Sequence, residues 1–145
     1  MPVIYARERA TYISDGETDP AIRQEVGSWF DLTSTQFTNG KMRITNDGGA
    51  YVIYRFTARR FSLMAAVSGV GFSEGVDITI NGVAVTPPPT QHVDNPNFPG
   101  NPEGTPSWPW FTSPDYGREI AIEVKLANSP TRGRYVFDNG VKLVF

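Results

Sequence analysis

The sequence predicts an all-β fold, a jelly-roll β-sandwich that occupies residues 1–145 as a single domain. Three observations support this fold class. Glycine (14 residues) and proline (12 residues) are frequent and divide the chain into short segments. Within those segments apolar residues recur at every second position, which is typical of strands and not of helices. An Asn-Gly dipeptide also joins two alternating segments, which is the strongest short-range signal of a β-hairpin.

The chain begins with a segment, residues 1–18, that we expect to be an extended arm. Its alternation is weak, and its mixture of charged and apolar residues is too polar for a core and too apolar for free solution. An arm laid across a neighbouring subunit would satisfy both requirements. The residues expected to make the arm contacts are Val3, Ile4, Tyr5 and Tyr12.

One short helix is expected next, over Asp19–Val26. Asp19 is a favourable N-cap residue, and Pro20 suits the first helical position because its missing N–H is not needed there. Gly27 would end the helix. A segment of this length forms about two turns at most.

The body of the sandwich is predicted from alternating segments in which one face is apolar. In the strand from Tyr51, for example, Val52, Tyr54 and Phe56 share one face. The Asn81-Gly82 turn makes the fourth and fifth of these segments a hairpin. The predicted strands are Lys41–Thr45, Tyr51–Thr57, Arg60–Ser68, Val76–Ile80 and Val83–Val85.

Three closing strands are expected near the end of the chain. Residues Ile120–Leu126 alternate strictly, which indicates an antiparallel strand with one buried and one solvated face. Tyr135–Phe137 and Val141–Phe145 follow, separated by the turn Asp138-Asn139-Gly140. Roughly eight short strands in all fit a sandwich.

A long loop is expected between the hairpin and the closing strands, over residues 86–117. It contains nine of the twelve prolines. Proline cannot donate to a sheet ladder, so central strands are excluded there. A loop of this length in a compact domain favours a role in function or in contact with a partner.

The loop carries an aromatic cluster that supplies the candidate binding residues. Large flat rings stack on sugar faces and also anchor protein interfaces. Three interpretations stay open, namely that the rings cap one end of the sandwich, that they contact a partner protein, or that they stack on a sugar. The residues are Phe98, Trp108, Trp110, Phe111 and Tyr116.

Composition excludes several classes of function. The formal net charge is -2 and charged residues make up 19% of the chain, so neither nucleic acid nor a membrane is expected as a partner. The absence of cysteine excludes disulfides, thiolate metal sites and thiol nucleophiles. No membrane-spanning stretch and no secretory signal are evident, which predicts synthesis in a cytoplasm.

No catalytic residue, metal site or cofactor is predicted. His92 is the only histidine, so a histidine-based triad or a two-histidine metal site cannot form within one chain. Carboxylates are the remaining route to catalysis, since a glycosidase needs only two at a suitable separation. Asp94, Glu103 and Asp115 fall in the long loop, where acidic residues are common and solvated. We therefore expect a protein that is not an enzyme.

Several of the predicted strands resemble the galactose-binding-like jelly rolls, which are modules found beside many glycosidases and esterases. The resemblance rests on the segments Gly49–Thr57, Arg60–Leu63 and Val76–Val83, the last ending in an Asn-Gly hairpin. It implies a jelly-roll fold and a sugar-binding activity. The architecture of an extended arm with a jelly-roll body is also similar to that of bacteriophage head decoration and cement proteins.

Two functional hypotheses follow. The first is a viral structural protein, a phage capsid decoration or cement protein located in the virion, whose arm and long loop bind the major capsid protein or other virion subunits. This resemblance also implies a homo-oligomer, specifically a trimer. The alternative is a carbohydrate-binding module, or a receptor-binding tail module, that stacks a glycan on Trp108, Trp110 and Tyr116.

Overall fold

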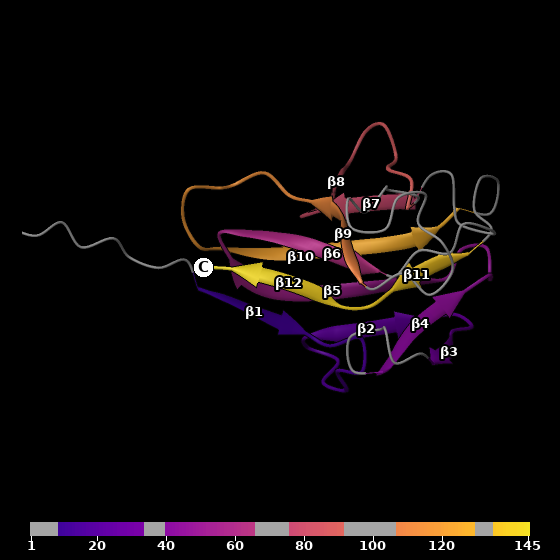
Figure 1. Ribbon diagram of the computed structural model, residues 1–145. Coiled ribbons are helices and arrows are strands. Elements are labelled where there is room, and N and C mark those ends of the chain that lie inside the picture. The colour runs from indigo at the N-terminus through magenta and orange to yellow at the C-terminus, as the bar shows by residue number, and fades with distance from the viewer. Residues whose placement is uncertain (1–8, 34–39, 66–75, 92–106, 130–134) are drawn as a thin grey trace, which may run out of the picture.

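The computed structural model describes residues 9–33, 40–65, 76–91, 107–129 and 135–145 (Figure 1). These residues form strands that are arranged in three antiparallel sheets. The prediction of an all-β sandwich is confirmed. In the described part of the chain no helix is long and apolar enough to cross a membrane.

One layer is a four-stranded sheet in which every neighbouring pair is antiparallel. In Figure 1 its strand β12 passes in front of β5, which belongs to the other layer. Its outer strands are β1 and β9, and no other strand of the described residues pairs with their outer edges. In spatial order the strands are β1 (Ala10–Ile13), β12 (Val141–Val144), β6 (Arg60–Ala65) and β9 (Trp108–Thr112).

The other layer is a five-stranded sheet, with its longest strands at the centre. β10 pairs with β5 over eight residue positions, from Ile120 opposite Ala58 to Ala127 opposite Tyr51. The short strand β8 leaves the outer edge of this sheet free. In spatial order the strands are β2 (Arg23–Val26), β5 (Tyr51–Ala58), β10 (Ile120–Asn128), β7 (Val76–Ile80) and β8 (Val83–Ala84).

A third, three-stranded sheet consists of β11 (Val136–Asp138), β4 (Lys41–Thr45) and β3 (Phe30–Thr33). The chain passes from this sheet into the four-stranded sheet at Asn139 and Gly140, between β11 and β12. Gly140 has a φ of 93°, a conformation that glycine adopts at no steric cost. The predicted turn at Asp138-Asn139-Gly140 is therefore the point at which the chain changes sheets.

The core lies between the layers and is formed by the apolar residues that alternate along the strands. Val52 and Tyr54 of β5 are fully buried, as are Phe61 and Leu63 of β6 and Val124 of β10. Phe56 and Phe61 pack edge to face, with ring centroids 5.3 Å apart. The period-two pattern thus correctly predicted which face of these strands is buried.

The predicted short helix at Asp19–Val26 is wrong. Residues from Asp19 form a turn, in which the backbone N–H of Ile22 donates to the carbonyl of Asp19 at 2.9 Å, and the chain then enters β2. The Asp19 carboxylate accepts a hydrogen bond from the N–H of Ala21, so it stabilises a turn and does not cap a helix. Pairing of β2 with β5 outweighs the local helix signal.

The expected arm and loop both contain strands. Ala10–Ile13 of the arm form β1, which pairs with β12 of the same chain, while Val3, Ile4 and Tyr5 lie outside the described residues. Within the expected loop, Trp108–Thr112 form β9. Pro109 is tolerated because β9 is an edge strand, where one side of the backbone needs no ladder partner.

Candidate functional site

A groove of about 610 Å³ lies between the free edges of the two main sheets, where β8 and β9 leave the sandwich open. One wall comes from the β7–β8 hairpin, and the other comes from β9 and the segment that follows it. Among the described residues that line the groove, none is charged. They are Ile80, Asn81, Val83, Ala84, Val85, Phe111, Thr112, Ser113, Pro114 and Tyr116.

The hairpin wall is held in place by Asn81. Asn81 and Gly82 have φ values of 50° and 81°, as a two-residue hairpin turn requires. The Asn81 backbone N–H donates to the carbonyl of Glu123 at 2.8 Å, and its side-chain oxygen accepts from the Glu123 N–H at 2.8 Å. Its amide also donates to the Ala121 carbonyl. Because Asn81 continues the ladder to β10, the hairpin turn is anchored to the sheet.

The opposite wall is anchored to β6 and to the residue before it. The Ser113 hydroxyl accepts a hydrogen bond from the N–H of Phe61 at 2.9 Å, and the Ser113 N–H donates to the Phe61 carbonyl at 2.9 Å. The N–H of Tyr116 donates to the carbonyl of Arg59, also at 2.9 Å. The segment that carries Tyr116 is therefore tied to the sandwich at two points.

Two aromatic side chains, Phe111 and Tyr116, line the groove and pack against the core from outside. The Phe111 ring centroid lies 6.2 Å from that of Phe61, so the core supports this ring from behind. Partial burial raises the pKa of the Tyr116 hydroxyl, which therefore stays protonated and able to donate. The groove thus offers half-buried rings together with hydroxyl groups.

The two predicted tryptophans, Trp108 and Trp110, do not line this groove. Trp110 is 5% exposed and belongs to the core, and Trp108 is half-buried. A bulge explains the burial of Trp110: Leu63 pairs with Phe111 and Met64 with Pro109, so Trp110 has no opposite residue and turns inward. Phe98 and His92 lie outside the described residues, and Tyr12 is 51% exposed on β1.

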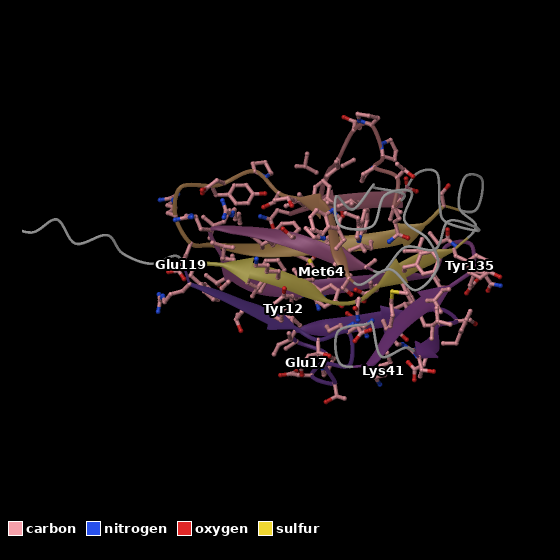
Figure 2. All side chains as sticks on the ribbon, in the orientation of Figure 1. Tyr12, Glu17, Lys41, Met64, Glu119 and Tyr135 are labelled. Atoms are coloured by element: carbon pink, nitrogen blue, oxygen red, sulfur yellow. The ribbon has the colours of Figure 1, made fainter. Side chains whose placement is uncertain are left out.

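A second depression, of about 270 Å³, is polar and lies where the β1–β2 connection meets β4. Figure 2 labels two of its lining residues, Glu17 and Lys41, at the lower edge of the view. Ion pairs line this depression. Glu25 contacts both Arg23 and Arg43, and Arg43 also contacts Asp31 at 2.9 Å.

Beneath this depression lies a buried polar network. The Arg23 guanidinium donates to the Asp138 carboxylate at 2.9 Å and to the Tyr54 hydroxyl at 3.0 Å. The Tyr54 hydroxyl in turn donates to Asp138 at 2.6 Å. All three side chains are buried, and each charge is paired, as burial of a charge requires. The network therefore joins the five-stranded and three-stranded sheets.

Asp15 is the carboxyl group with the most perturbed environment in the depression. Burial, together with the nearby Asp138 carboxylate, raises the pKa of Asp15 from 3.8 to about 6. Hydrogen bonds from Arg43 lower the pKa of Asp31, and those from Arg43 and Arg23 lower that of Glu25 against the effect of its burial. The Asp15 carboxylate accepts from the Arg43 backbone N–H at 3.0 Å, so its contacts position β4.

Sequence reasoning found part of the groove and missed the rest. The Asn-Gly turn, Phe111 and Tyr116 were identified, whereas Ile80, Val83 and Pro114 were not singled out. Val83 is 71% exposed, and an exposed valine in a two-residue strand is a signal of an open sheet edge. The opposite wall depends on β9 pairing with β6, which local sequence does not encode.

The β-rich fold of this chain is similar to that of part of several solved structures. The similarity is seen in solved structures, since no family model and no curated protein sequence matches the chain.

Two kinds of solved structure illustrate this similarity. The catalytic domain of a GH87 alpha-1,3-glucanase in complex with nigerose has a TM-score of 0.53 at 14% identity, over 92% of this chain and 28% of that one. An exo-beta-1,3-galactanase from Phanerochaete chrysosporium with beta-1,3-galactotriose has a TM-score of 0.53 at 15% identity, over 97% of this chain and 30% of that one. The chain thus spans less than a third of the length of these proteins.

These comparisons correct the prediction that the chain is not an enzyme, because the structures that share its fold are glycoside hydrolases. That prediction rested on the single histidine, on the missing cysteine, and on the interpretation of the loop carboxylates Asp94, Glu103 and Asp115 as ordinary solvated residues, although two carboxylates are enough for glycoside hydrolysis. At 14% and 15% identity the similarity shows the fold alone. It gives no support to a role in a virion.

Proposed function

We propose that the chain binds carbohydrate in the groove between β8 and β9. The observation that carries this proposal is the combination of the half-buried rings of Phe111 and Tyr116 with hydroxyl groups, in a groove whose described lining residues carry no charge. The C–H face of a sugar ring packs on an aromatic ring, while its hydroxyl groups require hydrogen-bonding partners. Thr112 and Tyr116 carry such partners at the groove.

The rigidity of both walls supports the proposal. The hairpin turn is anchored to β10 through Asn81, and the opposite wall is anchored through Ser113 to Phe61. A site that is already in place loses little conformational entropy when a ligand binds. None of the described residues that line the groove is charged, which favours neutral sugars, because these residues offer no counter-ion to a charged sugar.

The experiment is a titration calorimetry measurement with two probes, nigerose and beta-1,3-galactotriose, preceded by a glycan array of neutral oligosaccharides. The probes are chosen because the solved structures of similar fold hold them. We expect the chain to retain at least one neutral oligosaccharide on the array. If the array and both titrations show no binding at millimolar ligand, the proposal is wrong.

We predict that Tyr116→Ala weakens that binding by roughly tenfold, since an aromatic contact contributes about 0.5–1.5 kcal/mol beyond its buried area. Tyr116→Phe keeps the ring and is the matched control, so it should retain most of the affinity. Thermal unfolding of both variants checks that the fold is intact. Equal affinities for Tyr116→Ala and the wild type would remove Tyr116 from the site.

A further inference from the structure

We infer that the binding site continues from the groove across the outer face of the four-stranded sheet, so that its ligand is a linear oligosaccharide of several units lying across the strands. This inference rests on the proposed function and specifies its ligand. The far end of the extended site is Tyr12, on the edge strand β1.

The strand register places four side chains in a single row across this sheet. Tyr12 of β1 is opposite Lys142 of β12, Lys142 is opposite Ser62 of β6, and Ser62 is opposite Thr112 of β9. Residues directly opposite each other in antiparallel strands point to the same face, with Cβ atoms about 5 Å apart. The four side chains therefore share one face and follow one line.

Two observations show that this face is the outer one. The adjacent residues in β6 and β12, Phe61, Leu63, Val141 and Leu143, are buried in the core, so the residues between them point away from it. The hydroxyl oxygens of Ser62 and Thr112 lie 2.9 Å apart in an exposed hydrogen bond. The row crosses three strand spacings of about 4.8 Å each, a length of about 14 Å.

The row is continuous with the groove because Thr112 belongs to both. Beyond Thr112 it presents the hydroxyl of Ser62 and the ammonium group of Lys142, which can hydrogen-bond to sugar hydroxyl groups. It ends at the ring of Tyr12, which is 51% exposed and is labelled on β1 in Figure 2. An exposed flat ring in line with hydroxyl groups is suited to stack on a further sugar unit.

The test measures affinity as a function of chain length, with alpha-1,3-gluco-oligosaccharides and beta-1,3-galacto-oligosaccharides of two to six units as probes. Titration calorimetry of the wild type should show affinity rising with length until the chain spans the row. Tyr12→Ala should lower the affinity for the longest probe by roughly threefold to tenfold and leave that for the disaccharide unchanged. Tyr12→Phe should behave as the wild type.

Tyr51→Ala is the matched control, because this aromatic residue lies in the other sheet, where Lys125 stacks on its ring at 4.3 Å. It should leave the dependence on length unchanged. If the disaccharide binds as tightly as the hexasaccharide, or if Tyr12→Ala has no effect on any length, the extended site is wrong while the groove proposal stands. If no probe of either series binds, the proposed function fails, and the extended site with it.

Discussion

At the scale of single residues, some buried polar side chains take the place of backbone ladder partners. Gln91 is fully buried, and its amide donates to the Phe137 carbonyl at 2.6 Å while its oxygen accepts from the Phe137 N–H at 2.8 Å. Asp15 does the same for the N–H of Arg43. Such contacts satisfy buried backbone groups that no neighbouring strand reaches.

The raised pKa of Asp15 makes a prediction about pH. The unfolded value is 3.8 and the folded value is about 6, so the folded state binds the proton more tightly, and stability falls as pH rises across this interval. At 1.36 kcal/mol for each unit, the loss is about 3 kcal/mol at most. Asp15→Asn keeps an oxygen acceptor for Arg43 and has no proton to lose.

We therefore expect Asp15→Asn to gain stability relative to the wild type between pH 4 and pH 7. The measurement is urea unfolding of both proteins at half-unit steps of pH, with the difference in unfolding free energy as the readout. Glu25 and Asp31 have the opposite effect, because their lowered pKa values make stability fall at more acidic pH. Both proteins contain these two residues, so their contribution cancels when one unfolding free energy is subtracted from the other. A difference that stays constant across this range would contradict the assignment.

At the scale of elements, the strands with strict alternation were predictable from the sequence, since burial of one face fixes the pattern. β4 was predicted with its exact bounds, and β5 and β10 to within two residues. The helix signal at Asp19 failed because Arg23 bonds to Tyr54 and Asp138, which are distant in the sequence. β9 was missed because its proline suits only an edge strand, and local sequence does not show which strands lie at an edge.

The two glycine turns at Gly82 and Gly140 differ in what surrounds them, and this difference predicts unequal effects of substitution. Both have φ values that favour glycine. A Cβ at Gly82 meets no atom within 4 Å, whereas a Cβ at Gly140 would lie 2.4 Å from the carbonyl oxygen of Ile13. Gly82→Ala should cost about 1 kcal/mol of stability from backbone conformation alone, and Gly140→Ala at least about twice that.

Urea unfolding of the two variants, with Gly16→Ala as a control, measures these costs. Gly16 lies in an ordinary conformation, and a Cβ there would make only normal contacts, at 3.5 Å and beyond. If Gly82→Ala and Gly140→Ala lose comparable stability, the Ile13 carbonyl of β1 does not lie as close to Gly140 in solution as in the structure.

At the scale of the whole molecule, a buried polar network adds to the apolar core in holding the five-stranded and three-stranded sheets together. Arg23 and Tyr54 come from the five-stranded sheet, and Asp138 comes from the end of β11, immediately before the chain enters the four-stranded sheet. Of the candidate site, the sequence indicated Phe111, Tyr116 and the hairpin. The sequence could not show that the hairpin and these two aromatic residues lie together, because the groove forms only when β8 and β9 become the edges of opposite layers.

We predict that Asp138→Asn destabilises the whole molecule by about 1.5–3 kcal/mol, because it removes the buried one of the two carboxylates that pair with the Arg23 guanidinium and leaves only Glu25. The matched control is Asp115→Asn, which breaks the partly exposed pair with Arg59 at 3.2 Å and should cost less than about 1 kcal/mol. Urea unfolding gives both values. Equal losses in the two variants would show that the network does not hold the sheets together.

The proline in β9 has a consequence for crowded solutions. An exposed edge strand can pair with strands of other molecules through its free N–H and carbonyl groups, which is how many β proteins aggregate. Pro109 removes one backbone N–H donor from the edge strand β9, and the bulge at Trp110 interrupts the regular spacing of the neighbouring backbone groups. Both features discourage intermolecular sheet growth at the side of the molecule where we propose that carbohydrate binds.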